Sequence, residues 1–66
     1  MRLYEATAFF VDQDDDGKER ATFLVPPEHV FAETDHYAEK EFIIRHSSLL
    51  GEYRIEEVTI LVRPFA

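Results

Sequence analysis

The run from Asp12 to Lys18 constrains the fold of this chain more than any other feature, because it separates two segments that alternate like β-strands. Before the run, one face would carry Leu, Glu, Thr, Phe and Val, and the other Tyr, Ala, Ala and Phe. After it, Ala21 to Val25 has a similar composition. The run is rich in aspartate, and Gly17 can supply the positive φ of a tight turn. These features predict a β-hairpin with an acidic tip.

Two adjacent prolines, Pro26 and Pro27, follow the second segment directly. Neither has a backbone N–H that could donate to a sheet ladder. We therefore expect the second strand to end at the prolines and a loop to follow.

The stretch from Thr34 to Ser48 is predicted to form the helix. Thr34 suits the N-cap, and Asp35 in the first turn complements the positive end of the helix dipole. The apolar residues of the stretch point in three directions, which one sheet cannot cover. Either the helix ends early and Leu49 and Leu50 pack under the sheet from a loop, which we favour, or an apolar patch is left for a second copy or another protein.

The segment from Tyr53 to Arg63 is predicted to be a third strand that ends at Pro64, with a β-bulge where the alternation changes phase at Glu56-Glu57. The order strand, strand, helix, strand predicts one α+β domain over residues 1–66, with a three-stranded antiparallel sheet and one helix packed on a face. We expect a core formed by Leu3, Phe9, Val11, Phe23, Val25, Phe42, Ile55, Val58 and Ile60.

The composition favours a folded, soluble chain. Hydrophobic residues make up 45% of the sequence and nine residues are Phe or Tyr, which is too apolar for a disordered acidic tail. The apolar runs are far shorter than a membrane-spanning helix requires, and the first residues lack the apolar stretch of a signal peptide. Cysteine is absent, which is compatible with a reducing compartment. We therefore expect a cytoplasmic protein without a membrane partner.

The whole net charge of −7 lies in the middle of the chain. The segment from Asp12 to Glu41 holds ten acidic residues against three basic ones, whereas the two ends are each neutral. A segment of this kind projects negative potential and suits a basic partner. It also disfavours direct binding of nucleic acid, because phosphate contacts rely on lysine and arginine.

Motifs for metal binding and catalysis are incomplete. The string Asp12-x-Asp14-x-Asp16-Gly17 matches the first half of an EF-hand loop, but Phe23 stands where the closing glutamate belongs, so we favour a calcium-free turn. The three histidines lack the spacing of a zinc site. Two glycines and no nucleophile elbow leave little basis for enzyme activity. We expect no catalytic residue, metal or cofactor.

The acidic segment supports a hypothesis of nucleic-acid mimicry. Carboxylates three or four residues apart on a helix, such as Asp35 and Glu39, lie about 5 to 6 Å from each other, on the scale of neighbouring phosphates. The segment could present rows of negative charge to a groove built for DNA or RNA. The predicted partner-binding residues are Asp12, Asp14, Asp15, Asp16, Glu28, Glu33, Asp35, Glu39 and Glu41.

In its small size, lack of cysteine, strong acidity and simple α+β build, the chain resembles small phage-encoded inhibitors, in particular anti-CRISPR proteins of the DNA-mimic type. These inhibitors share no motif, so no single residue carries the resemblance. It implies a protein of the host cytoplasm that blocks the DNA-binding groove of a CRISPR effector. The chain departs from this pattern in concentrating its acids in one block, which leaves open whether one groove would engage them all.

A second hypothesis is a small structural or accessory module. Such a module would pair through its sheet edge or its extra helix face, and a homodimer formed through the helix is one version of it. Its charge would serve only solubility. Salt separates the two hypotheses, since a mimic loses affinity steeply as salt rises and an apolar interface barely responds.

Overall fold

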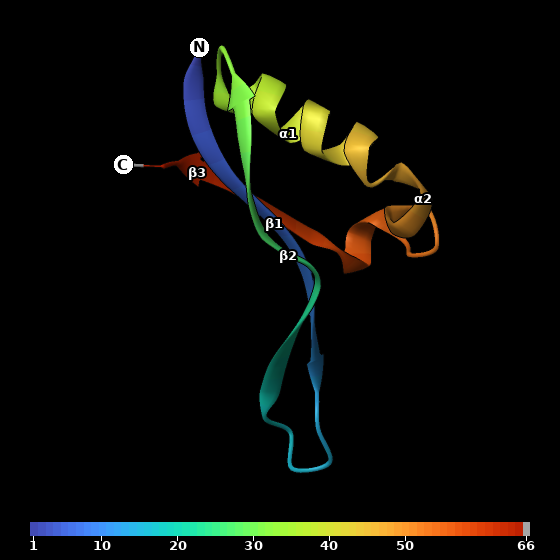
Figure 1. Cartoon of the computed structure of the whole chain (residues 1–66). Coiled ribbons are helices and arrows are strands. Elements are labelled where there is room, and N and C mark those ends of the chain that lie inside the picture. The colour runs from blue at the N-terminus through green and yellow to red at the C-terminus, as the bar shows by residue number, and fades with distance from the viewer. Residues whose placement is uncertain (66) are drawn as a thin grey trace.

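The computed structural model describes residues 1–65 and shows an antiparallel sheet with a helix on one face (Figure 1). Its strands lie in the order β2-β1-β3, so the first strand of the chain is central. The α+β class and the element order predicted from the sequence are confirmed. The elements are β1 (Arg2–Gln13), β2 (Glu19–Ala32), α1 (Asp35–Arg45), α2 (Ser47–Leu50), the 3-10 turn η1 (Ile55–Glu57) and β3 (Thr59–Pro64).

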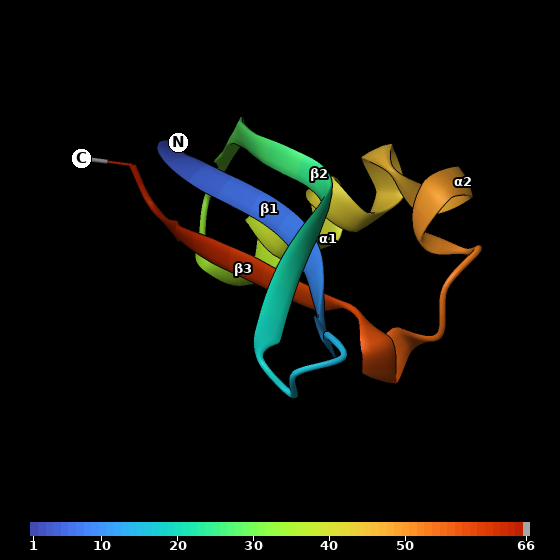
Figure 2. The same cartoon turned by 90° about the horizontal axis from the view of Figure 1, so that it is seen from below.

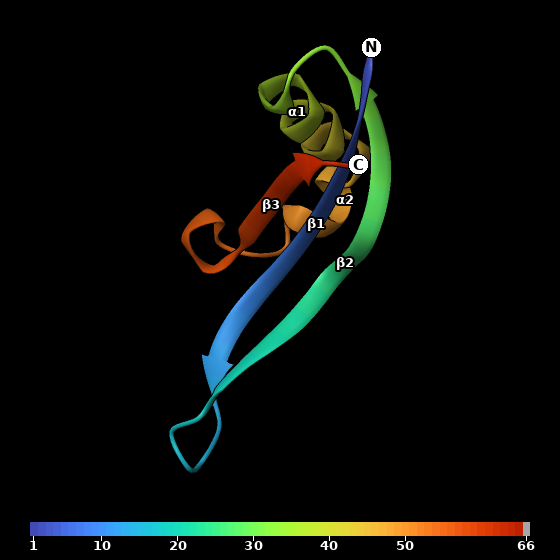
Figure 3. The ribbon, with the colours of Figure 1, turned by 90° about the vertical axis from the view of Figure 1, so that its left-hand side faces the viewer.

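The hairpin of β1 and β2 extends well beyond the helix. Figure 3 shows both strands running past α1 and β3 to a tip that stands away from the rest of the molecule. Figure 2 shows the three strands side by side, with α1 behind them. The molecule is therefore elongated, with principal extents of 44 × 26 × 16 Å.

The hairpin tip is closed by Asp14, as its aspartate-rich sequence predicts. The Asp14 amide donates to the carbonyl of Lys18 at 2.9 Å, and the Gly17 amide donates to the carbonyl of Asp14 at 3.0 Å. Oδ1 of Asp14 accepts from the amides of Asp16 and Lys18, each at 2.9 Å. Gly17 has a φ of 80°, which a residue with a side chain rarely adopts.

The prediction that Pro26 and Pro27 end the second strand is wrong, because β2 continues through them to Ala32. Ala6 pairs with Glu28 and Ala8 pairs with Val25, so the two prolines together lie opposite Thr7 alone. The prolines are tolerated because they lie in a β-bulge on an edge strand. The Thr7 hydroxyl donates to the carbonyl of Val25 at 2.6 Å and satisfies it at this irregularity.

The core lies on the face of β1 opposite to the one predicted. Tyr4, Ala6 and Ala8 are buried against α1, whose own buried residues are Ala38 and Phe42. The alanines have small side chains, which lets the helix approach the sheet closely. The large residues on the other face of β1 do not take part in the contact with α1.

The expected core residues therefore divide into three groups. Val25 and Phe42 are buried, and Val58 and Ile60 pack partly buried against the core. Leu3 and Phe9 are half-buried on the other face, where Val11 and Phe23 are 50% and 57% exposed. The side chain of Ile55 lies outside the described residues.

The helix ends earlier than Ser48, at Arg45, and the chain turns at His46 into the short α2. Leu49 and Leu50 pack partly buried against the core, which confirms the favoured prediction of an early helix end, but they belong to α2 rather than to a loop. The predicted N-cap is also confirmed, because the Thr34 hydroxyl accepts from the amide of Tyr37 at 3.3 Å.

The third strand is shorter than predicted. It begins at Thr59 and pairs with β1 from Phe9 to Tyr4. Glu56 and Glu57 lie in the 3-10 turn before the strand rather than in a β-bulge. Two consecutive acids in a helical turn also change the alternation of the sequence, which is why the pattern resembled a bulge.

Candidate partner-binding surface

Apart from Glu28, the predicted partner-binding acids lie in two groups, one at the tip of the hairpin and one beside its other end. The tip acids belong to the turn between β1 and β2, and the helix acids belong to the start and the exposed side of α1. Arg2 pairs with Ala32 at one end of the hairpin and Gln13 pairs with Glu19 at the other, a separation of about 36 Å along β1. The tip acids are Asp12, Asp14, Asp15 and Asp16, and the helix acids are Glu33, Asp35, Glu39 and Glu41.

The tip acids are held by the turn itself. Asp14 has a structural role, because one of its carboxylate oxygens accepts two backbone amides. Asp15 and Asp16, the next two residues, are exposed. The turn therefore fixes the backbone that carries two solvent-facing carboxylates.

Three of the helix acids, Glu33, Asp35 and Glu39, border two shallow hollows that share Asp35. One hollow, of about 340 Å³, is lined by Arg2, Tyr4, Glu33, Thr34, Asp35 and Pro64. The other, of about 380 Å³, lies between α1 and β3 and is lined by Asp35, His36, Glu39, Ile60, Leu61 and Val62. Asp35 and Glu39 stand one helical turn apart, as the sequence predicted. A cationic side chain of a partner could enter either hollow beside a carboxylate.

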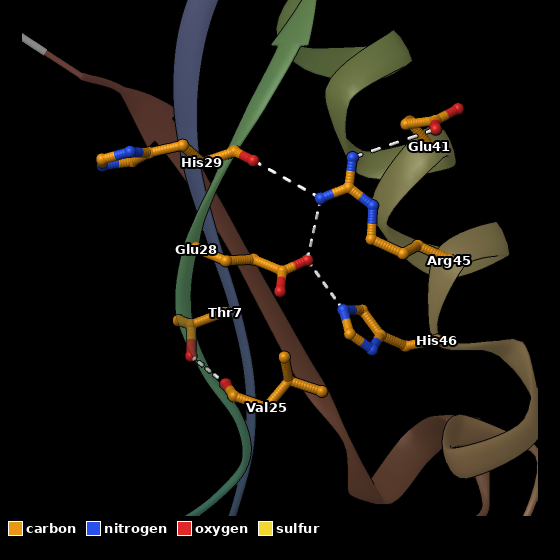
Figure 4. Close-up of polar contacts among 7 residues, drawn as sticks. All are labelled: Thr7, Val25, Glu28, His29, Glu41, Arg45 and His46. Carbon is orange, nitrogen blue, oxygen red and sulfur yellow. Dashed lines mark hydrogen bonds and ion pairs between the residues drawn. The ribbon is translucent and has the colours of Figure 1, made fainter.

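Glu28 differs from the other predicted acids, because it is engaged inside the molecule. Its Oε1 lies 2.7 Å from Nε2 of His46 and accepts from Nη1 of Arg45 at 3.2 Å (Figure 4). Burial by itself would raise the pKa of Glu28, but the hydrogen bonds and positive charges of His46 and Arg45 outweigh it and hold the pKa below its ordinary value. This carboxylate fastens β2 to the end of α1.

Arg45 contacts three groups around Glu28 and the end of α1. Besides Glu28, its guanidinium contacts the carbonyl of His29 at 3.4 Å and the carboxylate of Glu41 at 4.0 Å. A basic residue in the last turn also complements the negative end of the helix dipole. Glu41 is therefore partly neutralised, whereas Glu33, Asp35 and Glu39 face solvent.

The roles of Arg45 and His46 are not evident from the sequence. Both are 17 or 18 residues away from Glu28 along the chain, and no local pattern connects them. The signal that the sequence does offer is the position of Arg45 near the predicted end of the helix, since basic residues there often contact carbonyls and acids.

No group of three or more His, Asp or Glu residues within residues 1–65 is placed to hold a metal ion. His36 lies against Tyr37, His29 against Phe65 and His46 against Phe42. Glu56 and Glu57 are exposed in η1.

Comparisons with protein-family models, with curated proteins and with solved structures found no match for this chain. In the described part of the chain, no helix has the length and apolar character that crossing a bilayer requires.

Proposed function

We propose that this protein is a non-enzymatic, cytoplasmic binding protein that acts as a nucleic-acid mimic, blocking the DNA-binding groove of an effector in the manner of an anti-CRISPR inhibitor. The observation that carries the proposal is the exposure of carboxylates on two rigid elements, the closed hairpin tip and the capped start of α1. The charge of −7 makes a basic protein surface the natural partner.

Rigidity favours this function. The tip backbone is fixed by four hydrogen bonds that involve Asp14, and the first turn of α1 is fixed by the Thr34 cap. Carboxylates on ordered backbone lose less conformational entropy on docking than carboxylates on a flexible tail. The arrangement therefore suits recognition by a preformed groove.

The spacing of the two groups sets the shape of the partner. About 36 Å along β1 corresponds to about ten base pairs of duplex at 3.4 Å per pair. One groove can engage both groups only if it is elongated and basic along that length. Grooves that hold a guide–target duplex have this character.

The hollows beside the helix acids suit a partner that has projecting basic side chains. A lysine or arginine that enters beside Asp35 would pair with a carboxylate at the protein surface, as it would with a phosphate. Glu28 is outside the proposed contact set, because its charge is already paired with Arg45 and His46.

Competition tests the proposal directly. A purified, guide-loaded Cas9-type effector is mixed with labelled target duplex and increasing amounts of the protein, at low and at physiological salt. We expect the protein to displace the duplex, with an affinity that falls steeply as salt rises. Simultaneous binding of protein and duplex, or the absence of any binding across a panel of such effectors, would overturn the proposal.

Charge-neutral variants identify the acids responsible. Asp15→Asn with Asp16→Asn removes two tip charges and keeps Asp14, and Asp35→Asn with Glu39→Gln removes two helix charges. Glu56→Gln with Glu57→Gln is the matched control, because it removes two exposed charges from η1. The helix pair is expected to weaken binding most, because the hollows beside Asp35 and Glu39 allow a partner cation to be desolvated, and removing one partner of a buried charge pair costs about 2 to 5 kcal/mol. Equal binding by all three variants would contradict the mimic.

A protein-interaction module whose charge serves only solubility is the second candidate. One observation favours it: the face of the sheet opposite α1 exposes large apolar side chains, among them Phe23 and Leu61. Acid-to-amide substitutions would leave such an interaction intact.

A further inference from the structure

The sheet has one covered face and one open face. Tyr4, Ala6 and Ala8 of β1 face α1, so the alternate residues Leu3, Glu5, Thr7 and Phe9 point away from it. Pairing across the strands places apolar neighbours beside them. The open face is defined by Leu3, Phe9, Phe23, Phe31, Leu61 and Phe65.

Contacts between side chains confirm that these residues share a face. Phe9 and Phe23 pack edge to face with ring centroids 5.8 Å apart. Phe65, whose amide donates to the Leu3 carbonyl, packs on His29 at 4.2 Å. Phe23, Leu61 and Phe65 are nevertheless 57%, 47% and 44% exposed. Scattered apolar residues are normal on a surface, but a sheet face lined by them marks an interaction site.

The total surface area is larger than the average for folded monomers of this size. A folded monomer of 7.8 kDa exposes about 4,400 Å². This chain exposes 5085 Å². The excess of about 700 Å² is close to the 800 Å² or so that each partner buries in a standard stable interface. The molecule is elongated, and its hairpin projects beyond the helix (Figure 3).

Where the sheet has three strands, the open face carries no net charge, although the chain carries −7. The charged residues there are Glu5 and Arg63, and they pair with each other: Nη2 and Nε of Arg63 donate to Oε1 of Glu5 at 2.7 and 3.1 Å. His29 lies opposite Glu5 on β2, so Arg63, Glu5 and His29 form a polar row across the three strands. The helix acids belong to α1 and its approach on the covered side, and the tip acids lie at the far end of the hairpin. A second copy can therefore approach this face without like-charge repulsion across the contact.

We infer that the open face binds a second copy of this chain, so that two sheets pack face to face into a homodimer. Sheets in such a pair lie about 10 Å apart and bury the residues of their inner faces. A two-fold axis through the middle of the face brings Leu3 and Phe65 of each copy onto Phe9 and Phe23 of the other. The same surface then serves both copies, as two-fold symmetry requires. This interface lies on the side of the sheet away from the helix, unlike a dimer formed through α1.

Sedimentation equilibrium tests the inference on the intact chain, at about 10 to 500 µM. The parent is expected to sediment at twice its mass of 7.8 kDa. Phe23→Glu and Leu61→Glu each place a charge on the open face and are expected to sediment at the single-chain mass. Ile44→Glu is the matched control, because Ile44 is 60% exposed on α1, and it is expected to remain dimeric. Far-ultraviolet circular dichroism establishes that each variant is folded.

Two outcomes would overturn the inference. A parent chain that sediments at the single-chain mass throughout this range has no such interface. Dissociation by Ile44→Glu, with dimers retained by Phe23→Glu and Leu61→Glu, would place the contact on the helix instead. The dimer is expected to persist at high salt and in the acid-to-amide variants, because its contacts are apolar. Failure of the dimer and failure of the nucleic-acid mimic are thus observed separately.

Discussion

Nε2 of His46 and Oε1 of Glu28 lie 2.7 Å apart and join the end of α1 to the edge strand β2. The same oxygen accepts from Arg45, so one carboxylate holds two consecutive residues at the point where the helix ends. Together these contacts hold the exit of α1 against β2 (Figure 4), and Leu49 and Leu50 of α2 pack partly buried against the core.

The Glu28 cluster predicts a defined acid dependence of stability. Because folding lowers the pKa of Glu28, its contribution is fully present above the unfolded-state value of 4.5 and is lost as the pH falls through the folded-state pKa. Glu28→Gln is expected to cost about 1 kcal/mol at pH 7 and to flatten the decline of stability below pH 4.5. Urea unfolding at a series of pH values measures both effects. Glu39→Gln, an exposed acid on α1, is the control, and an equal change in that variant would contradict the assignment.

Thr7→Val is expected to destabilise the protein by about 1 to 2 kcal/mol, because the Val25 carbonyl would lose its 2.6 Å hydrogen bond while remaining buried. Valine keeps the shape of threonine and its preference for strands. The exposed Thr59→Val in β3 is the matched control and should change stability by less than about 0.5 kcal/mol. Chemical unfolding compares the two, and similar values for both would mean that the hydroxyl at the bulge has no special role.

Phe42→Ala is expected to lower the unfolding free energy by about 3 to 5 kcal/mol, because the ring is fully buried between helix and sheet. Phe23→Ala is expected to cost less than about 1 kcal/mol under conditions where the chain is monomeric, since its ring is 57% exposed. Denaturant unfolding at low protein concentration makes the comparison. A larger loss for Phe23 than for Phe42 would place the core on the other face of the sheet.

Millimolar calcium is expected to leave the melting temperature almost unchanged. Oδ1 of Asp14 is already occupied by the amides of Asp16 and Lys18, and Phe23 lies in β2 where a calcium loop needs a glutamate. Thermal unfolding with calcium and with a chelator measures the difference. A rise of several degrees that disappears in Asp15→Asn with Asp16→Asn would establish a calcium site at the tip.

Features set by neighbouring residues could be predicted from the sequence. The turn at Asp14 to Gly17, the Thr34 cap and the helical stretch depend on residues within a few positions of one another. The acids at the tip and on α1 could be placed for the same reason.

Features set by distant contacts could not be predicted. The alternation of β1 is equally regular on both faces, and only the close approach of α1 to Ala6 and Ala8 decides which face is buried. At the bulge beside Pro26, the carbonyl of Val25 is satisfied by the hydroxyl of Thr7 from another strand, and Glu28 pairs with residues 17 and 18 positions away. The local pattern around a residue does not show which distant residue it will contact.

The prolines of the edge strand also bear on how the protein behaves when it is crowded. An exposed strand edge is a template for the growth of intermolecular sheets and, in the extreme, of fibrils. Pro26 and Pro27 offer no amide hydrogen to an incoming strand, and the bulge they occupy interrupts the regular ladder of β2. The longest strand of the protein is thereby protected from aggregation along its outer edge.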